Sequence, residues 1–162
     1  MKNRQSAAKK AVARKSMDAV ELLKADHRQV SQWFEKFHKA RAASRKLQFA
    51  TKICEALKAH TQIEEEIFYP AFISATQDIE THHEALVEHS SAKDLIGQIL
   101  ALGPADEYFD AKVKVLGEMI KHHVKEEEQP GGMFAKARKT NLDLKALGAQ
   151  LRSRKQQLVQ RI

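Results

Sequence analysis

Four of the eight histidines in this 162-residue chain lie on the apolar faces of predicted helices, where they could bind a metal ion. On two of these helices a glutamate follows the histidine by four residues, so both side chains share one face and can contact one ion. A lone buried histidine is commonly a hydrogen-bonded core residue, but a buried carboxylate without compensation is costly. This combination therefore predicts a bound cation. The candidate ligands are His27, His60, Glu64, His89, His123 and Glu127.

The donor types indicate which metal such a site would take. Mixed imidazole and carboxylate ligands suit iron, manganese or zinc. Six ligands exceed the four of a tetrahedral zinc site, whereas two carboxylates can bridge two ions that are each also held by histidine. We therefore expect two non-haem iron ions, with zinc or manganese as alternatives. Because six side chains cannot fill two octahedral irons, water, hydroxide, oxo or a diatomic ligand must complete them.

The ligand on the fourth helix has a neighbour that could replace it. Adjacent His122 and His123 point about 100° apart, so usually one of them faces inward. His123 and Glu127 continue the stronger apolar stripe and are preferred, while His122 and Glu126 share a weaker face.

Other acidic residues and histidines are expected outside the site. The pairs Glu35–His38 and Glu80–His83 are predicted at opposite ends of the bundle, so we interpret both as surface pairs. We expect the remaining nearby glutamates to be solvated, and one of them, Glu65, could also support the ligands from outside. These glutamates are Glu65, Glu66 and Glu128.

Five helical segments are predicted to position these residues, and no strand pattern competes with them. Their short connections imply antiparallel neighbours, so we predict an all-α fold, an up-down-up-down four-helix bundle with a C-terminal fifth helix. A proline should disturb or end the second helix near Tyr69. The predicted boundaries are a capping box from Asp18, a cap at Ser44, Pro70, a start at Asp78, a stop at Gly103-Pro104, a start at Asp106, a stop at Pro130-Gly131-Gly132, and a last helix over roughly 141–160.

Charge divides the chain into three expected parts. Residues 1–16 carry six lysines and arginines and no acid, which predicts a disordered basic arm. Residues 17–135 carry 14 basic and 20 acidic residues and form the predicted metal-binding bundle. Residues 136–162 carry eight basic residues and one acid, and their amphipathic helix could form a homodimer. Because the bundle itself is acidic, the net charge of +7 does not favour nucleic acid as a partner.

Several classes of protein are disfavoured by the composition. The longest apolar run, at residues 67–73, is too short for a membrane span, and no apolar segment typical of a secretory signal follows the basic start. The single cysteine, Cys54, excludes an intrachain disulfide framework. We therefore expect a cytoplasmic protein.

The motifs around the candidate ligands resemble those of the hemerythrin-like, or HHE cation-binding, family. The resemblance covers about residues 18–135 and implies a four-helix bundle with an oxo- or hydroxo-bridged di-iron site held by the six residues named above. It rests on Leu-Leu-Lys-Ala-Asp-His27, on the segment from His60 to Pro70, on Glu88-His89 and on the segment from His122 to Glu128.

Two departures from this family bear on function. Oxygen carriers of the family have a second histidine one turn before the third-helix ligand, where this chain has Ala85. They also have His-x-x-x-x-Asp on the fourth helix, in place of His-x-x-x-Glu here. The missing histidine leaves a coordination position open, which disfavours simple reversible oxygen carriage. The segment Gln129–Phe134 should also loosen the end of the fourth helix.

We therefore expect binding of iron, dioxygen or nitric oxide in sensing, stress response or iron handling. Two alternatives remain. One is an enzyme that reduces peroxide or repairs iron–sulfur clusters, although the sequence offers no substrate-orienting residues that decide it. The other is a helical interaction module with a structural metal.

Overall fold

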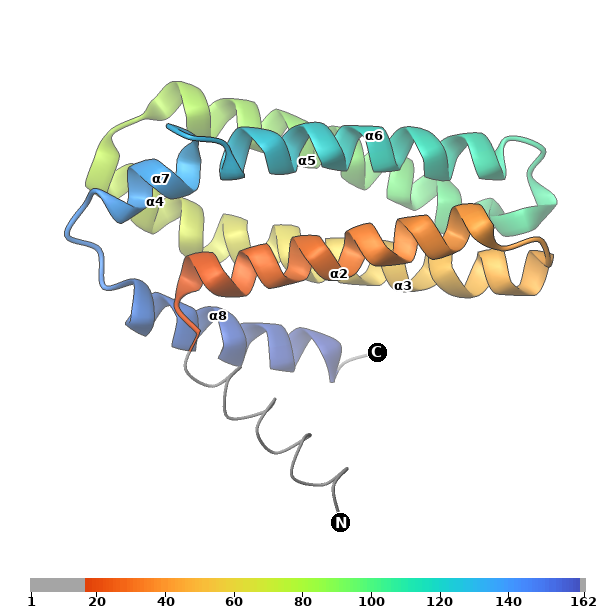
Figure 1. The fold of residues 1–162 in the computed structure, drawn as a ribbon, viewed down its shortest axis with the longest axis horizontal. Coiled ribbons are helices and arrows are strands. Elements are labelled where there is room, and N and C mark those ends of the chain that lie inside the picture. The colour runs from red at the N-terminus through yellow and green to blue at the C-terminus, as the bar shows by residue number, and fades with distance from the viewer. Residues whose placement is uncertain (1–16, 161–162) are drawn as a thin grey trace, which may run out of the picture.

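The chain, in a computed structural model that describes residues 17–160, folds into four long helical arms that run antiparallel (Figure 1). The predicted all-helical bundle with a C-terminal helix is confirmed, and residues 17–160 contain no strand. The expected basic arm, residues 1–16, lies outside the described residues. The elements are α2 (Ala19–Lys39), α3 (Ala43–Ile63), the π-helix η1 (Glu64–Phe68), α4 (Tyr69–Thr76), α5 (Ile79–Leu102), the 3₁₀ turn η2 (Gly103–Ala105), α6 (Phe109–Glu128), α7 (Met133–Arg138) and α8 (Leu144–Val159). The first arm is α2, the second is α3 with η1 and α4, the third is α5 and the fourth is α6.

Two of the predicted helix starts are confirmed by their caps. Asp18 and Glu21 form a capping box at α2, each accepting the other's backbone N–H at 2.9 Å. Asp78 caps α5 by accepting the N–H of Thr81 at 3.2 Å.

The other two predicted starts are wrong by one or more residues. Ser44 lies inside α3, whose N-cap is Ala42. Asp106 lies in the loop before α6 and accepts hydrogen bonds from the backbone N–H of Tyr108, which is the N-cap, and from Lys112. Serine and aspartate are both residue types that favour the N-cap position, but the turn geometry of each connection decides which residue becomes the cap.

Pro70 disturbs the second arm as predicted but does not end it, because helical structure continues to Thr76. Proline has no N–H to donate to the carbonyl four residues before it. The chain accommodates this by widening into a π-helical turn over Glu64–Phe68, in which the N–H of Tyr69 bonds to the carbonyl of Glu64.

A very short connection joins the first half of the bundle, α2 to α4, to its second half, α5 to α7. Only Gln77 and Asp78 separate α4 from α5. Gln77 has φ 57°, in the left-handed region that non-glycine residues seldom occupy.

The hydrophobic core is split into two clusters, one toward each end of the bundle. The first includes Leu23, Ile63 and Phe72, and the second includes Val30, Leu57 and Ile96. Between them, in sequence and along every arm, lie the candidate ligands. The fold therefore holds a polar layer sealed by apolar packing on both sides.

The segment after α6 differs from the prediction. The expected domain boundary between residues 135 and 136 falls inside α7, and the last helix is shorter than expected. Helix α6 ends at Glu128, and Met133 and Phe134 beyond it are buried and pack against the first core cluster.

The basic residues of this C-terminal segment pair with acids of the bundle. Arg154 contacts Glu66 at 2.6 Å, and Lys155 is paired with Asp26. Arg138 pairs with Asp18 and Lys136 with Asp78. The basic C-terminal segment and the acidic bundle, whose charges differ in the sequence, are therefore complementary within the fold.

None of the helices within residues 17–160 combines the length and the hydrophobicity that a membrane span requires.

Helix α8 approaches the start of α2 so closely that only glycine fits at position 148. A Cβ there would lie 2.6 Å from the carbonyl oxygen of Met17 and 2.9 Å from the nitrogen of Ala19, which are backbone atoms that cannot rotate away. Gly148→Ala is expected to destabilise the fold by about 1–3 kcal/mol in urea unfolding.

The matched control is Gly97→Ala on α5, where a Cβ meets nothing within 4 Å. Because alanine is the better helix former, this variant should gain up to about 1 kcal/mol. Equal shifts of the two unfolding midpoints would show that α8 is not packed as described.

Candidate metal centre

Six buried polar side chains converge at the middle of the bundle, and all six are the predicted ligands. Each of the four histidines comes from a different helical arm, and the two glutamates follow His60 and His123 by four residues. Their exposed fractions are His27 8%, His60 4%, Glu64 0%, His89 1%, His123 4% and Glu127 2%. Their convergence is a feature of the structure, and their role as ligands stays a prediction.

The histidines form two pairs through their Nε2 atoms. These atoms are 3.1 Å apart in His27 and His60, and 3.2 Å apart in His89 and His123. Two groups able to hold a metal ion result, one of His27, His60, Glu64 and Glu127, the other of Glu64, His89 and His123.

Each glutamate reaches both histidine pairs with a different oxygen. Glu64 places Oε1 3.2 Å from His60 Nε2 and Oε2 3.2 Å from His89 Nε2. Glu127 places Oε2 3.3 Å from His27 Nε2 and Oε1 3.4 Å from His123 Nε2. Glu64 Oε1 and Glu127 Oε2 are buried and accept no hydrogen bond within the described residues. Buried carboxylate oxygens without donors are expected at a site that binds a cation.

The outward nitrogen of every candidate histidine bonds to a second carboxylate. Such bonds fix the ring orientation and leave Nε2 free for a metal, as in most histidine metal sites. The Nδ1 contacts are His27–Glu128 at 2.7 Å, His60–Asp26 at 3.3 Å, His89–Glu65 at 2.9 Å and His123–Glu88 at 2.5 Å. Glu65, which the sequence suggested could support the site from outside, contacts His89, and Glu128, expected to be solvated, contacts His27 in the same way.

These contacts reveal an internal two-fold pattern that sequence reasoning missed. An acidic residue directly precedes the histidine in Asp26-His27 and in Glu88-His89. A second glutamate directly follows the central glutamate in Glu64-Glu65 and in Glu127-Glu128. The histidines of each half are 33 and 34 residues apart. The signal was visible as two Glu-Glu steps that follow acid–histidine steps at nearly equal distances, 38 residues from Asp26 to Glu64 and 39 from Glu88 to Glu127.

Tyr69 is a second residue that sequence reasoning did not place in the site. Its hydroxyl donates to Glu127 Oε1 at 3.0 Å and lies 3.1 Å from His89 Nε2. It also lies 3.4 Å from Glu64 Oε2. A residue five positions after Glu64 would leave the inward face of an α-helix, but the π-helical turn brings it back to that face.

The electrostatics of the site balance burial against opposite charges. Burial lowers the pKa of His60, but Glu64 and Asp26 outweigh it and raise that pKa to about 10. Burial opposes ionisation of Glu64 as well, yet His60 and His89 hold its pKa well below the usual value. Burial and the charges of Glu64 and Glu127 raise the pKa of Tyr69. Without metal, a proton on His60 therefore compensates the charge of Glu64.

The alternative ligands lie outside the cluster. His122 is 65% exposed and contacts only the outer carboxylate Glu88, at 3.3 Å. Glu35, His38, Glu80 and His83 are exposed at the surface.

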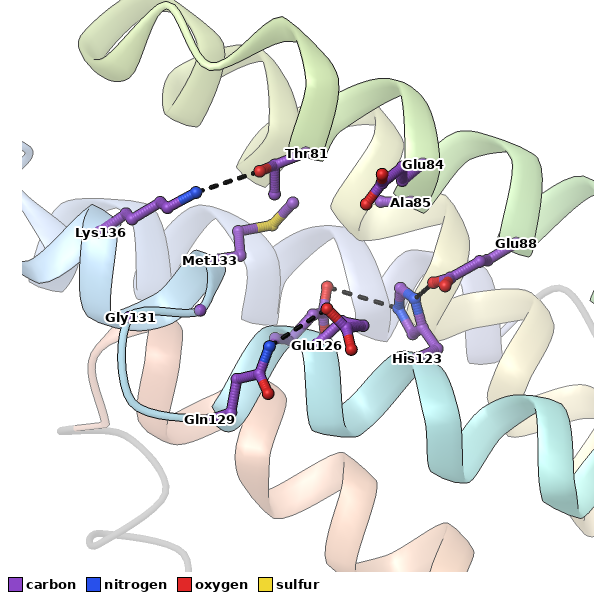
Figure 2. A pocket seen from close by; sticks show the side chains of 12 residues that line it. Thr81, Glu84, Ala85, Glu88, His123, Glu126, Gln129, Gly131, Met133 and Lys136 are labelled. Atoms are coloured by element: carbon purple, nitrogen blue, oxygen red, sulfur yellow. Dashed lines mark hydrogen bonds and ion pairs between the residues drawn. The ribbon is translucent and has the colours of Figure 1, made fainter.

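A polar cavity of about 80 Å³ lies against one side of the site, between α5, α6 and α7 (Figure 2). His123 and Glu127 line it, together with Ala85, which stands one turn before His89. The ring of Phe134, also on α7, is buried and stacks on His27 with a centroid distance of 5.8 Å.

The donor set fits a pair of metal ions. Four imidazole nitrogens and four carboxylate oxygens face one another across the layer, with each carboxylate shared between the two histidine pairs. Imidazole with carboxylate is the donor chemistry of iron, manganese and zinc.

Three comparisons relate the chain to known proteins. A family model described as "Hemerythrin HHE cation binding domain" matches residues 18–131. A hemerythrin HHE cation-binding domain-containing protein from Mycobacterium kansasii has a similar crystal structure, with TM-score 0.69 and 24% identity over 88% of this chain and 87% of that one. A protein of Nostoc sp. (strain PCC 7120 / SAG 25.82 / UTEX 2576) described as a DNA nickase is 28% identical over 115 residues. These are 71% of this chain, which spans about a third, 32%, of the Nostoc protein.

Proposed function

Because the chain belongs to the hemerythrin HHE cation-binding domain family, we propose that its buried cluster holds two non-haem iron ions that bind a diatomic ligand, dioxygen or nitric oxide. The roles that suit such a centre are sensing, stress response or iron handling. The observation that carries the proposal is the sharing of Glu64 and Glu127 between two histidine pairs. A single ion would need only one of these pairs, whereas two ions would be held by both pairs together with Glu64 and Glu127.

The residues of this chain have distinct tasks in that function. The six ligands hold the ions, and the outer carboxylates keep each imidazole in the tautomer that presents Nε2. The two core clusters exclude water from the two ends of the layer, and the Tyr69 hydroxyl donates to Glu127 at 3.0 Å. Two bound irons would supply electrons and open coordination positions for the diatomic ligand.

The position of Ala85 favours a reactive or sensing role over simple oxygen carriage. It is buried, with 5% of its surface exposed, and it faces the polar cavity beside His123. A side chain that could donate to a metal is therefore replaced by space for solvent or an external ligand.

Elemental analysis of the purified chain with an optical spectrum tests the proposal. We expect two irons per chain and a charge-transfer absorption band that dithionite removes and that dioxygen or nitric oxide changes. One zinc per chain with no such band would contradict it and support a helical module with a structural metal.

The same sample separates the proposal from the enzymatic alternatives. Consumption of peroxide, or restoration of an iron–sulfur cluster in a second protein, at rates above those of free iron would favour an enzyme. Rates equal to those of free iron favour ligand binding as the function.

A further inference from the structure

We infer that the polar cavity beside His123 is the route by which a divalent metal cation reaches the buried site. The inference rests on the proposed metal-binding function and goes beyond it by naming the path and the residues that attract the cation. The cavity of about 80 Å³ has room for several water molecules, so a partly hydrated ion fits inside it.

The floor of the cavity is made by two candidate ligands. His123 and Glu127 are 4% and 2% exposed and line it from α6. One oxygen of the Glu127 carboxylate accepts from Tyr69, and the other accepts no hydrogen bond. A buried carboxylate that lines a water-sized cavity and has one oxygen without a hydrogen bond is a strong acceptor for a cation and a poor one for an anion.

The wall of the cavity carries an excess of negative charge. Glu84 and Glu88 come from α5 and Glu126 from α6, on either side of His123 (Figure 2). The lysine on this wall, Lys136, donates to Asp78 Oδ2 at 2.5 Å and to Thr81 at 3.1 Å, so its charge is already compensated. A cavity lined by one sign of charge concentrates ions of the opposite sign.

Ala85 keeps this side of the site open, because a larger side chain at this position would fill the cavity. Gly132 also lines the cavity, and a Cβ there would lie 2.5 Å from the carbonyl oxygen of Glu126. The chain can therefore pass this close to the end of α6 only without a side chain.

The chemistry of the wall selects among the species that the site would meet. Dioxygen and nitric oxide are uncharged and gain nothing from the acidic wall, and anions are repelled by it. A divalent cation gains from every carboxylate that it passes and then meets Glu127. The wall therefore favours passage of the metal, whereas an uncharged diatomic ligand can enter the same space without being selected by the wall.

The test measures the rate at which the metal-free full chain takes up Co²⁺, followed by its visible absorption in a stopped-flow instrument. The variant Glu84→Gln with Glu126→Gln removes two wall charges and no proposed ligand. At low ionic strength we expect uptake to slow about 5- to 20-fold, with a weaker dependence on salt, and with unchanged final Co²⁺ content.

The matched control is Glu107→Gln with Glu118→Gln, which removes the same charge from exposed positions away from the cavity. This control should take up Co²⁺ at the wild-type rate. Equal rates in the two double variants would overturn the proposed route. A wild-type chain that takes up no Co²⁺ would instead overturn the metal-binding function itself.

Discussion

Glu64→Ala and Glu127→Ala are each expected to abolish the stabilisation that metal gives to the folded chain, while the four helical arms remain. Metal that binds only the folded state at about 1,000 times its Kd adds about 4 kcal/mol, which raises the Tm of a chain of this size by about 10 °C. Each variant removes the carboxylate that joins the two histidine pairs, so both metal positions lose a donor. Metal content after dialysis and Tm with and without Fe²⁺, under anaerobic conditions, measure the effect.

Three further variants serve as controls for this experiment. Glu66→Ala removes a neighbouring glutamate that binds Arg154 at the surface, and it should keep the full metal-induced shift. On α6, His123→Ala should lose the shift and His122→Ala should keep it, because only His123 faces the cluster. Loss of metal in His122→Ala alone would show that the wrong neighbour is assigned.

Stability of the metal-free protein is expected to fall as the pH rises from about 6.5 toward 10, and metal should reverse this trend. Burial lowers the pKa of His60, but Glu64 and Asp26 raise it to about 10, above the unfolded value of 6.5. A group with a raised pKa contributes stability that is complete below the unfolded pKa and is lost as the pH approaches the folded one. Each pKa unit corresponds to about 1.4 kcal/mol, so the loss amounts to several kcal/mol.

The reversal follows because metal binds the unprotonated imidazole. Raising the pH removes the competing protons, so the metal-induced rise in Tm should grow. Thermal unfolding between pH 6.5 and 8.5, with metal and with a chelator, gives the two slopes, and His60→Gln should flatten the slope of the metal-free form. Parallel slopes with and without metal would contradict the assignment of His60 as a ligand.

The arrangement of the six central residues could be predicted because it follows from helical periodicity alone. His60 and Glu64 lie one turn apart, as do His123 and Glu127, and the apolar stripe around them indicates which face is buried. Comparable depth of the four histidines in an antiparallel bundle then brings them to one layer. No long-range detail of the chain is needed for this step.

The features that could not be predicted depend on local departures from periodicity or on contacts across the chain. Tyr69 reaches the site through a π-helical turn that compensates for Pro70, and an α-helical count of residues places it elsewhere. Glu128 is partly exposed and becomes a partner of His27 only because α2 and α6 are neighbours. The glycines of the Pro-Gly-Gly turn suggested a loose end of the fourth helix. The sequence did not show that a short helix, α7, follows this turn and buries Phe134 in the core.

The strained turn at Gln77 and the two-fold pattern together have a consequence for assembly. Straightening Gln77 and Asp78 would release a conformation that a non-glycine residue holds at a cost of about 1 kcal/mol or more, and would join α4 and α5 into one rod. The contacts Glu65–His89 and Glu128–His27 run between the two halves of the bundle, so they can form equally well between halves of two molecules. Two chains that exchange halves would rebuild two complete sites with the bonds already present in one. Exchange of halves through this hinge would therefore need no contact at the site that the single chain does not already make.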